Sequence, residues 1–309
     1  MRYFHALLIV LLALALAACH SSQASTGSGG RPSVIRYAYS AMSEDPDAAA
    51  HRIQPLKRYL ERTLRARVDA VLTTNYSGVI EAFRAHKIDV ASISPFSYIL
   101  AAQKTPIEAI VMNGDPNGGP AVYTGSLAVA RNSPVRNLED VIRHSKELTI
   151  SFVDPDSASG FLVQNAYLQS QGIEPQRDFR KVMFTMNHLA SIMTLKAGKV
   201  DVAAVNERML NRWIQSGKLA AGDIRIVWTS PSIPNQPTAV SKSLPRPFIE
   251  EIRRAFLEMQ QKDPSAFAAR YSKMYSGFAR APYVRADDSM FDGLRQMARN
   301  VPNLNLLEH

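Results

Sequence analysis

The stretch Leu148–Leu168, LTISFVDPDSASGFLVQNAYL, combines a strand, a turn of small polar residues and a helix. Residues 148–152 alternate apolar and polar side chains as a half-buried strand does, and 161–168 are typical of a helix. The turn Val153–Gly160 therefore places backbone N–H groups, serine hydroxyls and the positive end of a helix dipole around one point, which suits a small oxyanion. An ordinary helix N-cap also explains these serines and aspartates, and this segment alone leaves both interpretations open.

The N-terminal segment predicts the compartment. Arg2 precedes an unbroken apolar run of 13 residues, Ala6 to Ala18, and Cys19 follows. A bilayer-spanning helix needs about 20 apolar residues, so residues 1–18 are predicted to be a signal peptide. The sequence Leu16-Ala17-Ala18-Cys19 resembles the bacterial lipobox, in which the cysteine is diacylated and becomes the mature N-terminus. An ordinary secretory signal with an incidental cysteine is the alternative.

Residues 19–31 are rich in Ser and Gly and are predicted to be a flexible tether. We therefore expect a lipid-anchored protein in the periplasm or at the outer face of the cytoplasmic membrane. Cys19 is the only cysteine, so the chain has no internal disulfide and no cysteine-based metal site. The net charge of +9 suits an anionic lipid or small ligand. Nucleic acid is not expected as a partner, because the protein is exported and its basic residues are scattered.

Strands and helices are predicted to alternate along the first part of the chain. Strands are expected at 34–39, 68–72 and 88–93, and helices at 50–66 and 78–86. This order predicts an α/β fold with mainly parallel sheets flanked by helices. The tail 278–307 is predicted to be mostly helical.

An internal echo suggests two lobes of similar construction. Residues 83–91, FRAHKIDVA, resemble 195–203, LKAGKVDVA, and each reads as a helix end, a tight turn and a buried strand. A common ancestral unit and two independent copies of one frequent turn both explain this likeness. Gly198 sits where a helix C-terminus favours a left-handed backbone.

The lobes are predicted to be discontinuous in sequence. The proline-rich segment 231–237 reads as a crossing between lobes. We therefore expect lobe 1 at 32–122 plus 231–309 and lobe 2 at 123–230, joined by a two-segment hinge. The cleft between two hinged lobes is the usual place for a ligand.

Short motifs in a fixed order carry a family resemblance. They are Gln54-Pro55-Leu56, Tyr59-Leu60, Tyr76, Ile80-Glu81-Ala82, Asp89-Val90-Ala91, Ser94-Pro95-Phe96-Ser97-Tyr98, Asp154-Pro155, Ser157-Ala158-Ser159-Gly160, Asn187-His188, Ser191-Ile192, Ile233-Pro234-Asn235, Ala286-Asp287-Asp288, Phe291-Asp292 and Arg295. The chain resembles the substrate-binding proteins of phosphonate, phosphite and phosphate-type ABC importers, a branch of the type II periplasmic binding proteins. The resemblance covers almost the whole mature chain.

The resemblance implies a ligand whose phosphorus oxygens are held by Ser157, the backbone of Ala158, and Ser159. It also implies two tyrosines that donate phenolic hydrogen bonds, at Tyr76 and Tyr123. Packing between the lobes is the alternative role for each tyrosine.

His188 is implied as a further donor, which can be neutral or cationic near neutral pH. Its alternative role is that of a helix-start residue bonded to the backbone.

Three departures from the family pattern bear on the ligand. Ala158 stands where the family often has Thr, Ser94 where Gly is usual, and Gln236 where members that hold an aminoalkyl phosphonate tend to have Asp. Glu207 remains a candidate partner for an ammonium group. We expect a ligand without a cationic tail, namely a simple alkyl phosphonate, phosphite or phosphate.

Two other functions are compatible with parts of the sequence. Ser157 and His188, with Asp154 or Asp156, suggest a hydrolase, but the chain has no Gly-x-Ser-x-Gly elbow and no paired histidine spacing for a metal. A lipid-tethered sensor for a signalling receptor would keep the fold and change the partner. We expect a monomeric binding protein that is not an enzyme, uses no cofactor or metal, and delivers its ligand to an ABC permease.

Overall fold

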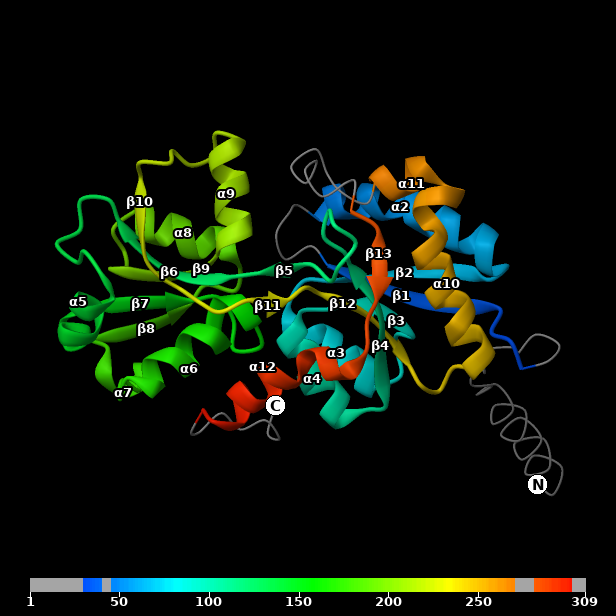
Figure 1. Cartoon of the computed structure of the whole chain (residues 1–309), viewed down its shortest axis with the longest axis horizontal. Coiled ribbons are helices and arrows are strands. Elements are labelled where there is room, and N and C mark those ends of the chain that lie inside the picture. The colour runs from blue at the N-terminus through cyan, green and yellow to red at the C-terminus, as the bar shows by residue number, and fades with distance from the viewer. Residues whose placement is uncertain (1–29, 41–45, 270–280, 302–309) are drawn as a thin grey trace, which may run out of the picture.

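The computed structural model describes residues 30–40, 46–269 and 281–301. These residues form two α/β lobes, each built on its own sheet, with two chain segments crossing between them (Figure 1). The α/β class predicted from the alternating pattern is confirmed.

The first lobe has three layers, with helices on both faces of a six-stranded sheet of order β13-β4-β12-β3-β1-β2. Its strands are β1 (Val34–Ser40), β2 (Arg67–Thr73), β3 (Val90–Ser92), β4 (Ile107–Asn113), β12 (Pro237–Ser241) and β13 (Tyr283–Arg285). Its helices are α2 (Pro46–Leu64), α3 (Tyr76–Arg84), α4 (Pro95–Lys104), α10 (Arg246–Lys262), α11 (Pro264–Ala269) and α12 (Asp292–Arg299), the last preceded by a 3-10 turn, Asp288–Phe291.

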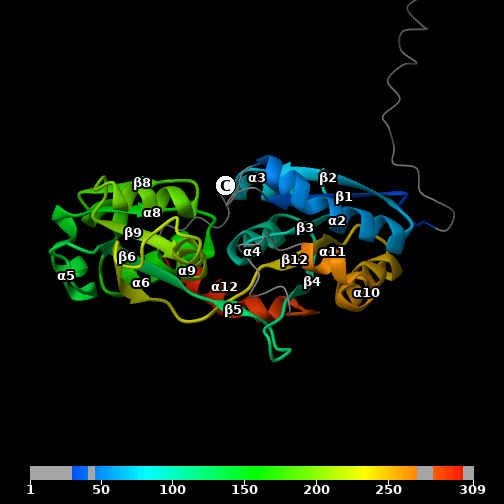
Figure 2. The ribbon, with the colours of Figure 1, turned by 90° about the horizontal axis from the view of Figure 1, so that it is seen from above.

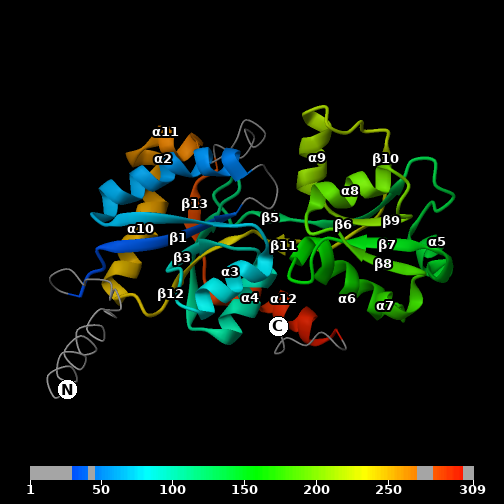
Figure 3. The same cartoon turned by 180° about the vertical axis from the view of Figure 1, so that it is seen from behind.

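The pleat of the first sheet divides its core in two. Val90 packs with α2, α10 and α11, whereas its neighbour Ala91 packs with α3, α4 and α12. Successive side chains of a strand point to opposite faces, so the two sets of helices cover opposite sides of the sheet (Figure 3).

The second lobe has the same three-layer construction on a five-stranded sheet of order β10-β6-β9-β7-β8. Its strands are β6 (Gly125–Ala130), β7 (Thr149–Phe152), β8 (Lys181–Phe184), β9 (Val202–Asn206) and β10 (Ile224–Thr229). Its helices are α5 (Leu138–Arg143), a 3-10 turn (Ser145–Glu147), a π-helical turn (Ala158–Leu162) that continues into α6 (Val163–Ser170), α7 (Pro175–Asp178), α8 (His188–Lys196) and α9 (Glu207–Gln215). Along β9, Val202 and Ala204 pack with α6, whereas Ala203 and Val205 pack with α8 and α9.

The pairing within the sheets agrees with the prediction of mainly parallel sheets, since most strands in each sheet run in the same direction, and it identifies the strands that are reversed. In the first sheet β1 is parallel to β2 and β3, but β12 and β13 are antiparallel to their neighbours. In the second sheet β7 is parallel to β8 and β9, but β6 is antiparallel to β9 and β10. The reversed strands β6 and β12 are those that follow directly on a crossing between lobes.

The internal echo has a structural counterpart. His86 and Gly198 occupy equivalent places in the two segments, and both adopt a positive φ, 52° and 67°. The N–H of the next residue, Lys87 or Lys199, donates to a carbonyl five residues back, Ala82 or Thr194. The two lobes therefore use the same helix-to-strand turn.

The crossing segments pair with each other between the lobes. Strand β5 (Val122–Tyr123) is antiparallel to β11 (Ile233–Pro234), with Tyr123 opposite Ile233. The N–H of Asn235 extends the pairing by donating to the carbonyl of Ala121 at 3.0 Å. The two paired strands β5 and β11 thus form the hinge (Figure 2).

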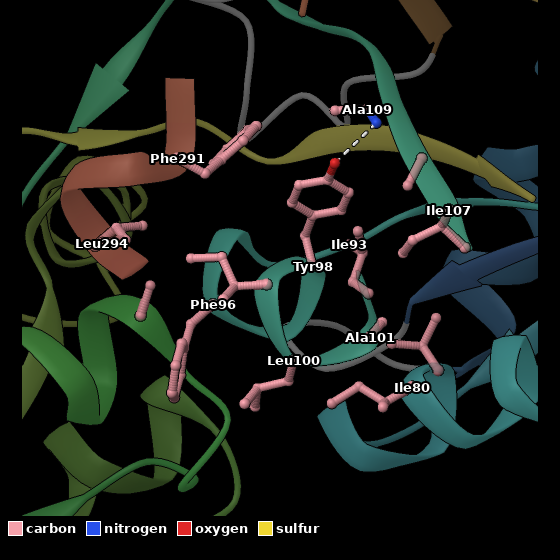
Figure 4. Close-up of a cluster of buried hydrophobic side chains, with 14 of the residues drawn as sticks. Ile80, Ile93, Phe96, Tyr98, Leu100, Ala101, Ile107, Ala109, Phe291 and Leu294 are labelled. Carbon is pink, nitrogen blue, oxygen red and sulfur yellow. Dashed lines mark hydrogen bonds between the residues drawn. The ribbon is translucent and has the colours of Figure 1, made fainter. Parts of the chain in front are cut away.

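The C-terminal helix lies between the lobes and contacts α4 on one side and α6 on the other. Phe291 and Leu294 pack near Phe96 and Tyr98 (Figure 4). The cluster around them also contains Leu162 from the second lobe. The prediction of a mostly helical tail is confirmed for α12 and wrong for Tyr283–Arg285, which forms the edge strand β13.

Candidate ligand-binding site

Most of the predicted site residues lie where strands end. Tyr76 follows β2, Ser157 follows β7, His188 follows β8 and Glu207 follows β9, while Tyr123 belongs to the crossing strand β5. The carboxyl ends of parallel strands are the usual place for a ligand in open α/β sheets. The structure therefore brings residues that are far apart in sequence to the edge where the lobes meet.

The turn after β7 is held by its own hydrogen bonds. The Asp154 carboxylate accepts from the N–H of Asp156 at 2.8 Å, and the Ser157 hydroxyl accepts from the N–H of Gly160 at 3.1 Å. Val153 donates to the carbonyl of Gly160 at 2.9 Å. Ser157 is thus an N-cap, which confirms the N-cap interpretation of this segment.

Two backbone N–H groups in this turn point to a second role. Ala158 and Ser159 are 0% and 2% exposed. Among the hydrogen bonds of the described residues, none is donated by the N–H of Ala158 or of Ser159. Buried N–H groups are almost always paired in native proteins, so these two are free to hold an oxyanion at a helix N-terminus.

Two tyrosines close on this turn. Tyr76 of the first lobe, which is 6% exposed, lies close enough to Ser157 of the second lobe for the serine to influence its pKa, and Tyr123 lies similarly close to Ser159. Burial raises the pKa of Tyr76 to about 12. Burial also raises the pKa of Tyr123, and the neighbouring Tyr76 raises it further by a smaller amount. Both phenols therefore stay protonated at neutral pH and can donate a hydrogen bond to a ligand.

His188 is the first residue of α8 and is buried. Its Nδ1 accepts from the N–H of Asn206 at 3.2 Å, which assigns the proton of the neutral ring to Nε2. Burial lowers the pKa of His188 to about 4. The side chain is therefore a neutral N–H donor at pH 7.

Asn206 connects two of these groups and was missed by reasoning from sequence. Its Nδ2 donates to the Ser159 hydroxyl at 3.1 Å, and its Oδ1 caps α9 by accepting from Met209 at 3.1 Å. Because the Ser159 oxygen accepts this bond, its own proton is available to an acceptor. An asparagine between a buried strand and a helix is the only signal that the sequence offered.

The end of the site beside the crossing strands β5 and β11, here called the hinge end, contains charged side chains from α9. The Glu207 carboxylate accepts from the hydroxyls of Thr124 at 2.5 Å and Ser126 at 3.4 Å, and the side chain of Gln236 is exposed. Arg208, which sequence reasoning also missed, lies with its Cζ 5.3 Å from the centroid of the Tyr123 ring. The positively charged group nearest this tyrosine thus comes from α9.

The described residues show no hydrogen-bonded Ser-His-Asp chain. Within the part of the chain that the structure describes, no hydrogen bond joins Ser157 to His188 or His188 to an aspartate. In the same residues, no cluster of three His, Cys, Asp or Glu side chains could hold a metal ion.

The predicted signal peptide, the tether up to residue 29 and Cys19 lie outside the described residues. A search of the described helices for one with the length and apolar character of a membrane span found none.

Known proteins are similar to this chain over most of its length. The phosphonates-binding periplasmic protein of Escherichia coli is 27% identical over 244 residues, 79% of this chain and 70% of that protein. The phosphate-import protein PhnD of Mycolicibacterium smegmatis is 28% identical over 260 residues, 80% and 79% of the two chains. The structure of PhnD1 from Prochlorococcus marinus in complex with methylphosphonate matches with a TM-score of 0.73 and 18% identity, covering 86% of this chain and 97% of that one.

The two-lobed type II periplasmic-binding-protein fold that the resemblance implied is thus confirmed. A family model described as the periplasmic substrate-binding protein of phosphonate ABC transporters matches residues 40–291. Because this match spans most of its length, the chain belongs to the family of phosphonate ABC transporter substrate-binding proteins.

Proposed function

We propose that this protein captures a small phosphorus oxyanion between its two lobes and delivers it to an ABC import permease. The observation that carries the proposal is the pair of buried N–H groups of Ala158 and Ser159, which face no acceptor among the described residues. The relatives support the choice of ligand class, because their names specify phosphonates and phosphate and one structure holds methylphosphonate.

The chemistry of the site suits an anion that is largely stripped of water. The donor groups around the turn after β7 have no formal charge: two N–H groups, the hydroxyls of Ser157 and Ser159, two phenols and the imidazole N–H of His188. Each hydrogen bond to a charged ligand contributes about 1.5–3 kcal/mol. With Ala158 in place of Thr, the turn has one hydroxyl fewer than is common in the family.

The organic end of the ligand is proposed to carry no positive charge. An ammonium group would need a carboxylate at the hinge end of the site. Gln236 offers an exposed amide there, and the Glu207 carboxylate is engaged by the hydroxyls of Thr124 and Ser126. We therefore favour alkyl phosphonate, phosphite or phosphate over 2-aminoethylphosphonate.

Capture is proposed to occur by closure about the hinge, with lobe 1 at 32–122 plus 231–309 and lobe 2 at 123–230. Tyr76 meets Ser157 across the lobes, and the Ser97 hydroxyl donates to the carbonyl of Asp156 at 3.0 Å. A ligand that bonds to both lobes favours the closed state by its differential affinity. A permease can then distinguish loaded from empty protein.

The decisive experiment is calorimetric titration with methylphosphonate, phosphite, phosphate and, as a competitor anion, sulfate. We expect saturable binding by the wild-type protein, and a loss of about 100-fold or more in the Ser157→Ala, Ser159→Ala double variant. The matched control is Ser170→Ala with Ser216→Ala, which removes two exposed hydroxyls of the same lobe.

Unchanged affinity in the Ser157/Ser159 variant would falsify the assigned site, provided circular dichroism shows it folded. Turnover of an activated ester or phosphate that depends on Ser157 would instead support the hydrolase.

We also propose that the mature protein is a monomer anchored by lipid on Cys19. A Cys19→Ser variant should then move from the membrane fraction to the soluble envelope fraction. Retention in the membrane fraction would contradict lipid anchoring and leave the binding proposal intact.

A sensor role for the same fold predicts a signalling receptor, not a permease, as the partner that co-purifies with the loaded protein.

A further inference from the structure

Arg208 holds a positive charge at the hinge end of the site. Its guanidinium donates to the carbonyl of Val122 at 2.7 Å and to the Asn235 side-chain oxygen at 3.4 Å. The same group lies over the Tyr123 ring, 5.3 Å from its centroid. Since Tyr123 also lies close to Ser159, one ring connects the oxyanion turn with this guanidinium.

Asn235 presents a donor that lacks an acceptor. It is 4% exposed, and its Oδ1 accepts from both the Gln236 N–H, at 2.9 Å, and Arg208. These two donors fix the orientation of the amide, because the reverse orientation would set its NH₂ group against them. Among the described residues the buried Nδ2 then has no hydrogen-bond partner.

An unsatisfied buried amide N–H calls for an acceptor. Arg208 and Asn235 together offer a guanidinium and an amide donor on the hinge side of Tyr123. This pair matches an anionic oxygen and repels an ammonium group. The neighbouring acid, Glu207, does not reverse this preference, because its carboxylate binds the hydroxyls of Thr124 and Ser126.

We propose that Arg208 and Asn235 form a second anionic subsite that receives a carboxylate on the organic end of the ligand. This inference rests on the proposed function, because the phosphonate group of the same ligand would occupy the turn of Ser157 and Ser159. Among phosphonates with a charged organic tail, the preferred ligand is therefore a short carboxyalkyl phosphonate, with one anionic group at each end. Arg208 is the residue that makes the site prefer a ligand tail with a negative charge.

The test measures selectivity with four probes: methylphosphonate, phosphonoacetate, 3-phosphonopropionate and 2-aminoethylphosphonate. The wild-type protein should bind the better carboxyalkyl probe about tenfold or more tightly than the aminoethyl probe. In Arg208→Gln the affinity ratio of the carboxyalkyl probe to methylphosphonate should fall by about tenfold. Arg208→Lys should restore part of that ratio, because it keeps the charge without the planar fork.

Arg225→Gln is the matched control. Like Arg208, Arg225 makes two hydrogen bonds through its guanidinium, here to the backbone carbonyls of Val135 and Arg131 in the second lobe. This variant should retain the wild-type ratio.

The outcomes separate this inference from the proposed function. Binding of methylphosphonate with no preference for the carboxyalkyl over the aminoethyl probe would overturn the second subsite alone. An equal loss for all four probes in Arg208→Gln would also overturn it, because Arg208 would then act only by holding the hinge. Failure of the wild-type protein to bind any of the probes, phosphite or phosphate would overturn the proposed function itself.

Discussion

The imidazole of His188 shows how a donor beside the oxyanion turn stays uncharged while serving an anion. The ring is buried, and its one described hydrogen bond comes from the N–H of Asn206 to Nδ1. Burial disfavours the imidazolium and holds its pKa near 4, below the ordinary 6.5. The neutral ring therefore already carries a proton on Nε2 and can donate a hydrogen bond at pH 7.

This burial predicts an acid-sensitive contribution to stability. The folded-state pKa of about 4 lies below the unfolded value of 6.5, so protonation favours the unfolded chain. The free energy of unfolding should be fully retained above pH 6.5 and fall as the pH drops toward 4, by about 3 kcal/mol from this residue.

Denaturant titrations across this pH range check the prediction. His188→Asn, whose amide oxygen can replace Nδ1 as acceptor, should show a shallower loss than the wild type. Replacement of the exposed His144 by Asn serves as the control. Parallel pH slopes in wild type and His188→Asn would contradict the assignment.

Local motifs made some site residues predictable and left others hidden. Ser157, Ser159 and His188 stand at helix starts that can be read from neighbouring residues. The roles of Asn206 and Arg208 depend instead on groups that folding brings to them from distant segments, the Ser159 hydroxyl and the carbonyl of Val122. No periodicity or spacing in the chain records such contacts.

At the scale of the element, the turn between β7 and α6 depends on a close approach of two backbones. A Cβ at Gly160 would lie 2.5 Å from the Cβ of Val153 and 2.9 Å from the Ser157 hydroxyl oxygen. The glycine is therefore required by space and not by a left-handed backbone, since its φ is not positive.

Gly160→Ala should displace the whole turn. We expect a destabilisation of about 1–3 kcal/mol, as overpacking causes, together with a large loss of oxyanion affinity. Gly293→Ala on α12 is the control, because a Cβ there meets nothing within 4 Å, and its stability should stay equal or rise slightly. Chemical unfolding and calorimetric titration measure both effects. Retained affinity in Gly160→Ala would show that the N–H groups of the turn do not position the ligand.

Elements with a clear period could be predicted, whereas the reversal of single strands within the mainly parallel sheets could not. The repeated helix-to-strand turn at His86 and Gly198 was visible as an echo in sequence. The antiparallel strands β6 and β12 depend on where the chain crosses between the lobes. The three residues of β13 are too few for a pattern, and only their pairing with β4 makes them a strand.

At the scale of the whole molecule, the C-terminal segment couples the two lobes. Phe291 is fully buried, and its ring centroid is 5.0 Å from that of Tyr98 on α4. The same cluster includes Leu162 and Val163 from the second lobe, and α12 contacts α6. A shared apolar core should make the lobes unfold together, because the unfolding of either lobe exposes apolar side chains of the other lobe to water.

Truncation of this shared core should therefore do more than lower stability. Phe291→Ala should cost about 3–5 kcal/mol and convert one calorimetric unfolding transition into two, one for each lobe. Phe267→Ala is the matched control, because Phe267 is equally buried but packs in the core confined to the first lobe. It should lower stability by a similar amount, through loss of the first lobe's own packing, without relieving the coupling between the lobes. A single transition in Phe291→Ala, merely shifted to lower temperature, would mean that the hinge strands β5 and β11 couple the lobes and the C-terminal helix does not.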